Sequence, residues 1–100
     1  MPTYRPSPRF WKDHGGLSEA DKREFRAAVD RFIAGLASGS GRFHPSLRVH
    51  RLASTSDVWS LTWGKGGKGR ATFRYGASVH AGQPHVEWLG VTADHSLYAG

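Results

Sequence analysis

The segment 69–75 contains two arginines whose spacing lets both act on one ligand. Side chains of a β-strand alternate between its two faces, so Arg70 and Arg74 share one face if this segment is a strand. Their Cα atoms are then about 13 Å apart, which is four residues of rise. Because a guanidinium stays charged and binds phosphate through paired hydrogen bonds, the two residues predict a face that binds a polyanion. The alternative is an ordinary antiparallel strand with a solvated polar face.

The whole chain is basic. Its 100 residues include 14 Lys and Arg against 8 Asp and Glu, for a formal net charge of +6. Such an excess favours an anionic partner, namely nucleic acid, an acidic protein or membrane phosphates. Arginine accounts for 10 of the 14 cations, which favours phosphate recognition, although a GC-rich genome produces the same bias.

One domain over residues 1–100 has to position these arginines, because a chain of this length has little room for a second core. Residues 1–16 are expected to form a Pro-rich lead-in. Within it, residues 2–9 are extended and can add a strand only at a sheet edge, while Phe10 and Trp11 can open a short helical turn. The lead-in is therefore not expected to contribute a central element.

A helix is expected after the lead-in. Ser18 and Asp21 form a capping-box-like start, and a segment rich in glycine and serine ends the helix after Leu36. Apolar residues recur between these limits at the spacing of one helical stripe. The stripe consists of Phe25, Val29, Phe32, Ile33 and Leu36.

Four strands are expected after the helix, because the apolar period changes to two. They cover 47–52, 58–63, 69–75 and 85–91, with a flexible glycine-rich hairpin loop at 64–69. The last strand is the most apolar and is expected to be central. The fold class is then α+β, with an N-terminal helix or helices on one face of a four-stranded, largely antiparallel sheet. The expected core joins Val49, Trp59, Leu61, Trp63, Ala71, Phe73, Tyr75 and Trp88 to Phe25, Phe32 and Leu36 of the helix.

This order of elements resembles the RelE/ParE superfamily, the small basic toxins of bacterial type II toxin–antitoxin pairs. A basic L-x-V-x-x-L strand that leads into an aromatic strand is matched by FHPSLRVHRLASTSDVWSLTW. The family's Y-R-I-x-Y/F strand is matched by GRATFRYG, with Arg70 at the arginine. Its closing strand and G-x-H-x-x-Y pattern are matched by HVEWLGVTADHSLYAG, with His95 and Tyr98 at the histidine and tyrosine. The resemblance covers roughly residues 17–98.

The resemblance implies one of two activities. RelE-like members cut mRNA, many of them in the ribosomal A site, whereas ParE-like members poison DNA gyrase. In both groups a cognate antitoxin wraps the toxin and neutralises it. We expect a metal-independent mRNA endoribonuclease, because a His–Tyr pair beside strand arginines offers the proton transfer that blocking gyrase does not need. A non-catalytic nucleic-acid-binding domain is the remaining alternative, since the charge supports it equally.

RNA cleavage without a metal uses the substrate's own 2′-hydroxyl as the nucleophile. A base removes its proton, an acid protonates the leaving 5′-oxygen, and fixed positive charge stabilises the phosphorane. Arg70 and Arg74 are the candidates for the positive charge. His95 is the candidate for proton transfer, because histidine titrates near neutral pH, and Tyr98 for stacking on a base or orienting the reacting groups.

Four further cations are expected to bind the RNA backbone. Lys65 and Lys68 reach it from the hairpin loop as mobile point charges, while Arg48 and Arg51 belong to the basic strand. Loop lysines otherwise serve only solubility. Many family members carry another arginine at the position of Thr62, in the strand before the loop.

Each catalytic candidate also has an alternative role. Arg74 can pair with Glu87 across the sheet, and Glu87 can act as the base only if it lies on the solvated face. His95 can be an exposed histidine of the tail. Tyr98 can close the core.

Other chemistries are not expected. The chain has no cysteine, which excludes disulfides and thiolate catalysis and fits a reducing cytosol. Its six histidines form no close ligand pair, so neither a metal nor another cofactor is expected. The segment 64–70 lacks the spacing of a phosphate-binding P-loop. No apolar run is long enough to span a membrane and no signal segment precedes residue 10, so a cytoplasmic location is expected.

Overall fold

The computed structural model describes residues 3–38, 43–52, 57–77, 79 and 84–93. The elements are β1 (Thr3–Pro6), α1 (Pro8–Gly15), α2 (Glu19–Ser38), the 3-10 turn η1 (Pro45–Leu47), β2 (His50–Arg51), β3 (Trp59–Trp63), the 3-10 turn η2 (Lys65–Gly67), β4 (Gly69–Gly76) and β5 (His85–Thr92). The fold is α+β, as expected, with two α-helices and one mixed sheet.

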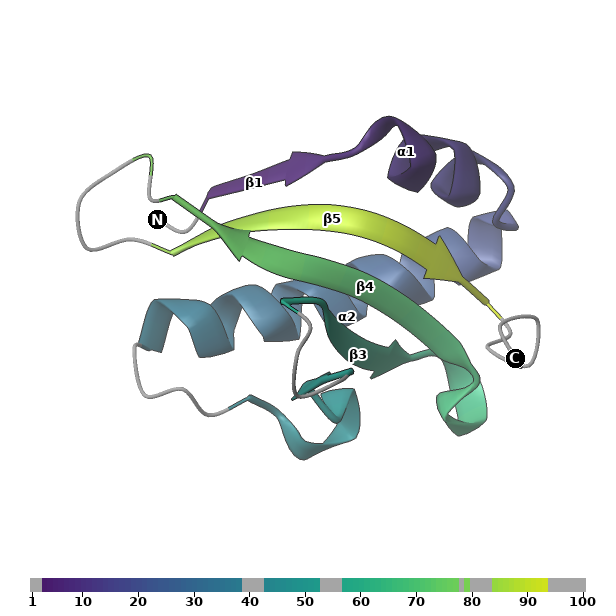
Figure 1. Ribbon diagram of the computed structural model, residues 1–100. Helices are drawn as coiled ribbons and strands as arrows, with labels where there is room; N and C mark the ends of the chain where they lie inside the picture. Colours follow the sequence, from purple (N-terminus) through teal and green to yellow (C-terminus); the bar gives the residue numbers. More distant parts are fainter. Residues whose placement is uncertain (1–2, 39–42, 53–56, 78, 80–83, 94–100) are drawn as a thin grey trace.

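The sheet has five strands in the order β1-β5-β4-β3-β2 (Figure 1). The four strands from β2 to β5 pair antiparallel with their neighbours. The expected four-stranded sheet is corrected by the addition of β1, which pairs in parallel with β5, from Thr3 opposite His85 to Pro6 opposite Trp88. A strand that ends in proline is compatible with this position because proline cannot donate a ladder hydrogen bond, so it is tolerated at an edge.

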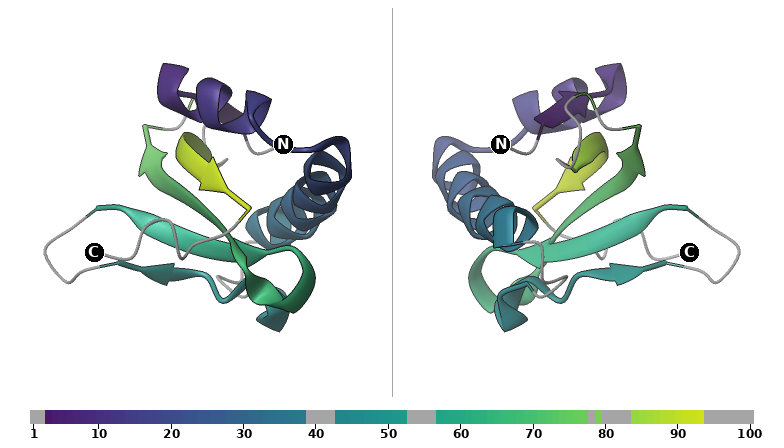
Figure 2. Two further views of the ribbon diagram at one scale, coloured as in Figure 1. Left: turned by 90° about the vertical axis from the view of Figure 1, so that its right-hand side faces the viewer. Right: turned by 90° about the vertical axis from the view of Figure 1, so that its left-hand side faces the viewer.

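Helix α2 lies on one face of the sheet (Figure 2). Its start is the predicted one, because the Ser18 hydroxyl accepts a hydrogen bond from the Asp21 backbone N–H at 3.1 Å. Phe32 packs against the sheet, with its ring centre 4.8 Å from that of Phe73 and 5.6 Å from that of Trp88. Removing a buried phenylalanine side chain of this kind costs about 3–5 kcal/mol, so these contacts fix α2 on the sheet.

Helix α1 packs on the same face, beside α2. Ser7 caps it, since its hydroxyl accepts from the Phe10 N–H at 3.1 Å. Ser7 is also tied to β5, because its N–H donates to the Trp88 carbonyl at 2.9 Å and its hydroxyl to the Leu89 carbonyl at 3.2 Å. The ring of Phe10 then contacts Phe25 of α2 and Trp88 of β5, at 5.9 and 5.7 Å. The lead-in is therefore a docked strand and helix.

The strand expected at 47–52 is wrong except for the two residues of β2 in its second half. Leu47 is fully buried and ends η1 instead of opening a strand. Arg48 has a left-handed backbone, with φ 44° and ψ 47°, a conformation that a strand residue cannot adopt. The turn begins at His44, whose ring nitrogen Nδ1 accepts from the Ser46 N–H at 3.2 Å. A capped turn with a buried leucine therefore replaces half of the expected strand.

The predicted core is largely confirmed, with four corrections. The buried side chains include Leu61, Trp63, Ala71, Phe73, Trp88, Phe25 and Phe32. Val49, Trp59 and Leu36 are only partly buried against them. Tyr75 is 42% exposed, because its ring packs edge-on against the rings of Trp59 and Phe73 and leaves its remaining surface in solvent.

The hairpin between β3 and β4 needs its glycines. Gly64, Gly66 and Gly67 have φ of 84°, 68° and 69°, in the region that other residues rarely adopt. Glycine is needed at position 69 for a different reason, because a Cβ there would lie 2.5 Å from the ring of Trp63 and 2.7 Å from the Trp63 carbonyl oxygen. The loop is thus a defined 3-10 turn whose return strand passes directly under Trp63.

Candidate nucleic-acid interface

The face of the sheet that points away from α2 carries polar side chains. In β4, Ala71 and Phe73 are buried on the helix side, so Arg70, Thr72 and Arg74 lie on the opposite face. This is the alternation predicted for the segment. In Figure 1, α2 lies behind β3 and β4, so the polar face is the one turned toward the viewer.

A β-bulge in β5 shifts its pairing with β4 by one residue, so that apolar residues on both sides of the bulge face the core. Thr72 pairs with Gly90 and Phe73 with Trp88, so Leu89 between them has no partner in β4. The extra residue lets Trp88 and Val91, three positions apart, both face the core. It also puts Thr92 in register with Arg70.

Arg70 is the best-positioned cation of this polar face. Its Nη1 donates to the Thr62 hydroxyl oxygen at 3.0 Å, across the β3–β4 pair. Thr62 is itself only 5% exposed, and its methyl group lies against Gly67 of η2. Within the described parts of the chain no carboxylate forms an ion pair with Arg70. Its guanidinium is therefore oriented by a neutral partner and keeps its full charge for a ligand.

Arg74 has the alternative role described above, because it pairs with Glu87 across the sheet. Its Nε donates to Glu87 Oε1 at 2.7 Å, and both side chains are partly exposed. Glu87 lies on the solvated face, but its carboxylate is already engaged by Arg74. Arg5 of β1 is the register partner of Glu87 on the other side, so two arginines flank one glutamate in this row of the sheet.

The four expected backbone-binding cations do not lie on one face. Lys68 is exposed immediately before β4 and so stands close to Arg70 in the chain, while Lys65 opens η2. Arg48 is exposed in the turn after η1. Arg51 is in register with Trp59, whose ring contacts Tyr75 on the helix side of the sheet, so Arg51 lies on the opposite face from Arg70.

His95 and Tyr98 lie outside the described residues. The element before them is β5, which ends at Thr92. The strand therefore ends in the same row of the sheet as Arg70.

His50 lies on the polar face and was not among the predicted site residues. It is exposed, and it is the register partner of Ser60, which in turn pairs with Thr72. Its Nδ1 is 2.8 Å from the backbone carbonyl oxygen of Arg48. The alternation of 47–52 could have identified it, because His50 follows the inward-facing Val49 directly.

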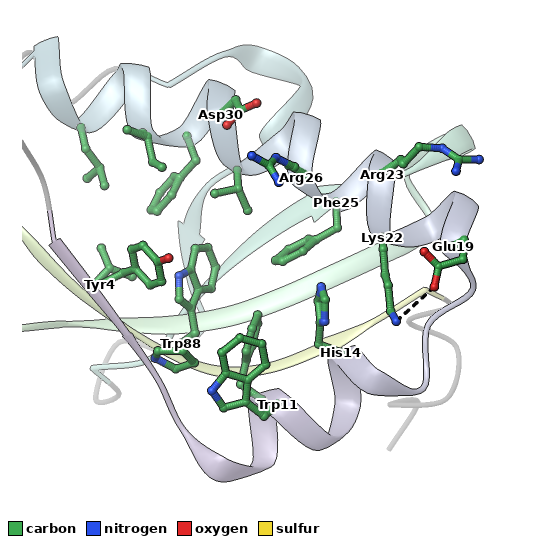
Figure 3. A pocket seen from close by; sticks show the side chains of 17 residues that line it. Tyr4, Trp11, His14, Glu19, Lys22, Arg23, Phe25, Arg26, Asp30 and Trp88 are labelled. Atoms are coloured by element: carbon green, nitrogen blue, oxygen red, sulfur yellow. Dashed lines mark hydrogen bonds and ion pairs between the residues drawn. The ribbon is translucent and has the colours of Figure 1, made fainter.

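An apolar groove of about 600 Å³ runs on the helix side, between α1 and α2, with Val86 and Trp88 of β5 on its floor (Figure 3). Tyr4 and Trp11 stand along one side and are 64% and 59% exposed. On the α2 side the groove is bordered by charged residues, namely Glu19, Lys22, Arg23, Arg26 and Asp30. The groove was not predicted because it depends on how the lead-in docks.

The described residues include no cluster of His, Asp or Glu that could hold a metal ion. Among them there is also no helix of the length and apolarity needed to cross a membrane. No protein-family model, no curated protein and no solved structure matches the chain.

Proposed function

We propose that the protein is a RelE/ParE-like toxin that cleaves mRNA without a metal. The observation that carries this proposal is Arg70, a fully charged guanidinium oriented by Thr62 on the polar face of the sheet. Its position in GRATFRYG is that of the family's strand arginine. In the proposed reaction Arg70 binds the scissile phosphodiester and stabilises the phosphorane as negative charge develops.

His95 is proposed to transfer a proton at the same phosphodiester. Thr92 is in register with Arg70, and three residues of chain span at most about 10–11 Å. This length of chain allows the proposed contact of the His95 imidazole with a phosphate bound by Arg70. Tyr98, which matches the family's tyrosine, is proposed to stack on a neighbouring base.

The reaction needs no external reagent. The 2′-oxygen loses its proton to a base and attacks phosphorus, and the bond from phosphorus to the 5′-oxygen breaks. An acid then protonates the 5′-oxygen. The products are a 2′,3′-cyclic phosphate and a free 5′-hydroxyl, so the end groups of a cut RNA report the mechanism.

The remaining cations are proposed to bind the RNA backbone. Lys68 and Lys65 precede β4 at the end of the sheet where Arg70 lies, and Arg48 is exposed beside β2. Arg74 attracts the RNA backbone more weakly, because its charge is partly offset by Glu87. Arg51, on the other face, is proposed to contact strands of RNA that pass over the β2 edge. The proposed substrate is translated mRNA in the cytoplasm.

A neutralising antitoxin is proposed to occupy the groove between α1 and α2. The groove is apolar and open, and its aromatic side chains Tyr4 and Trp11 are exposed. Its α2 border has three cations against two carboxylates. These properties suit an amphipathic helix with an acidic flank. Ile33→Asp, on the groove wall, should abolish neutralisation by such a partner while RNA cleavage persists.

The test is cleavage of a defined mRNA by the purified protein, with and without translating ribosomes and in the presence of a chelator. We expect cuts that end in 2′,3′-cyclic phosphate, that resist the chelator and that disappear in Arg70→Ala. Intact mRNA in both conditions together with inhibition of gyrase would support the ParE-like alternative. Intact mRNA without gyrase inhibition, but with binding of RNA, would support a non-catalytic binding domain.

A further inference from the structure

We propose that His50 is the base that removes the 2′-hydroxyl proton. This inference rests on the proposed nuclease function. It is carried by the hydrogen bond of the His50 ring, by the turn that holds its acceptor, and by the row of the sheet in which His50 lies.

The hydrogen bond of His50 fixes which ring nitrogen is basic. Nδ1 lies 2.8 Å from the carbonyl oxygen of Arg48, and a carbonyl oxygen only accepts hydrogen bonds. Nδ1 must therefore carry the proton, so the neutral ring presents an unprotonated Nε2 to solvent. A general base needs such a lone pair in a fixed orientation.

The backbone that supplies this carbonyl is held in an uncommon conformation. Arg48 has φ 44° and ψ 47°, which costs free energy for a residue other than glycine and is concentrated at functional sites. Leu47, fully buried beside it, anchors the turn, and the Arg48 N–H closes the turn onto the Pro45 carbonyl at 3.3 Å. The group that orients the His50 imidazole is thus a backbone carbonyl fixed by the turn, whereas a side-chain acceptor could change its rotamer.

The sheet register brings His50 toward Arg70. His50, Ser60 and Thr72 lie in one row across β2, β3 and β4, and Arg70 is two residues before Thr72 on the same face. Two strand spacings and two residues of rise put the two Cα atoms about 12 Å apart. The Arg70 guanidinium leans toward β3, because its Nη1 bonds Thr62. In the proposed complex, the phosphodiester with its adjacent 2′-hydroxyl lies between these two side chains.

His44 provides the matched contrast in the same segment. It is also exposed, but its Nδ1 accepts the Ser46 N–H at 3.2 Å. Neutral His44 therefore carries its proton on Nε2 and offers a donor where His50 offers a lone pair. Asparagine can keep the capping role of His44, so His44→Asn is a control that changes a neighbouring histidine without touching the proposed base.

The first experiment compares His50→Gln, His50→Ala and His44→Asn with the unaltered protein in the mRNA cleavage assay. Because general base catalysis contributes about 100- to 10,000-fold, we expect both His50 variants to cleave at least about 100-fold more slowly, and His44→Asn at an unchanged rate. Free imidazole should restore part of the activity of His50→Ala only. Melting curves should coincide, since an exposed substitution changes stability by only about 0.5 kcal/mol.

The second experiment distinguishes the base from the acid. An RNA with sulfur in place of the leaving 5′-oxygen needs no protonation of the leaving group. It should restore the rate of His95→Ala and leave His50→Ala slow. Full activity of His50→Gln, or restoration of His50→Ala by the sulfur substrate, would overturn the assignment while the nuclease function stands. An unaltered protein that cleaves neither substrate would overturn the nuclease function itself.

Discussion

Arg70 donates a hydrogen bond to the Thr62 hydroxyl across the β3–β4 pair, and no carboxylate among the described residues pairs with it. Thr62 is buried, and its methyl group lies so close to Gly67 that a Cβ there would meet it at 3.3 Å. Many members of the proposed family have an arginine at the position of Thr62. Here a neutral hydroxyl orients Arg70, so the proposed role of Arg70 depends on Thr62.

Thr62→Val should slow RNA cleavage without unfolding the protein. Valine keeps the shape of threonine but cannot accept the Arg70 hydrogen bond, which is worth about 0.5–1.5 kcal/mol and hence about 2- to 12-fold in rate. Single-turnover cleavage of a defined mRNA measures the effect. Thr62→Ser keeps the acceptor and should retain most of the rate. A larger loss in Thr62→Ser, which lacks the methyl group, than in Thr62→Val, which keeps it, would show that the methyl packing beside Gly67 matters, and not the hydrogen bond.

Arg70→Lys should lose far more activity than Arg74→Ala. Lysine keeps the charge of Arg70 but loses the planar fork that binds phosphate through two hydrogen bonds, so we expect a loss of about 100-fold or more, comparable to removal of one oxyanion donor. Arg74 is already paired with Glu87, so its loss should cost less than about 10-fold. The ranking is checked by cleavage rates at one salt concentration, and a reversed order would contradict the site.

The Arg74–Glu87 pair should contribute little to stability. The two side chains are 47% and 30% exposed, and ion pairs of this kind contribute about 0–1 kcal/mol. A double-mutant cycle with Arg74→Ala and Glu87→Ala, followed by urea unfolding, should give a coupling free energy below about 1 kcal/mol. A coupling energy well above this value would mean that Glu87 is needed to hold the sheet together.

Gly69→Ala should destabilise the fold, whereas Gly15→Ala should not. A Cβ at Gly69 would meet the Trp63 ring at 2.5 Å and its carbonyl oxygen at 2.7 Å, while a Cβ at Gly15 has nothing within 4 Å. Overpacking of this kind costs about 1–3 kcal/mol, and alanine near the end of α1 is neutral or slightly stabilising. Thermal unfolding of both variants makes the comparison, and equal melting temperatures would contradict the close approach.

Tyr75 should make the fold less stable at high pH. Burial raises the pKa of the Tyr75 hydroxyl above its ordinary value, so the folded state holds this proton more tightly than the unfolded state. The stabilisation is complete below the ordinary pKa of about 10 and is lost as pH rises through the higher pKa of the folded state. The free energy of unfolding of the unaltered protein, measured relative to Tyr75→Phe, should therefore fall above about pH 10. A constant difference would show that the hydroxyl is not desolvated.

The sequence predicted those parts of the fold that local patterns determine. The Ser18 cap, the helical stripe with Phe32 and the alternation around Arg70 all follow from spacing within one segment, and the structure has each of them. The same alternation put Arg74 on the face of Glu87, so their pairing could be named in advance as an alternative.

The parts that could not be predicted depend on contacts between distant segments or on single backbone angles. Residues 2–9 are expected to be able to add an edge strand, and β1 is one. Its parallel pairing with β5 joins segments about 80 residues apart, and no pattern within the segment specifies that partner. Arg48 ends the expected strand through a left-handed backbone that its residue type does not favour. The unpaired Leu89 shifts the register of β5 by one residue. The groove depends on the first of these features, because Tyr4 of β1 is part of its lining.

The pairing of β1 with β5 has a consequence for how the protein is made. Strand β1 (Thr3–Pro6) pairs with β5 (His85–Thr92), so it cannot join the sheet before β5 has been synthesised. A nascent chain therefore cannot complete the sheet until β5 has left the ribosomal tunnel. Long-range pairing of this kind also slows folding. The row that holds Arg70 is complete only at that stage, because Thr92 is its last member.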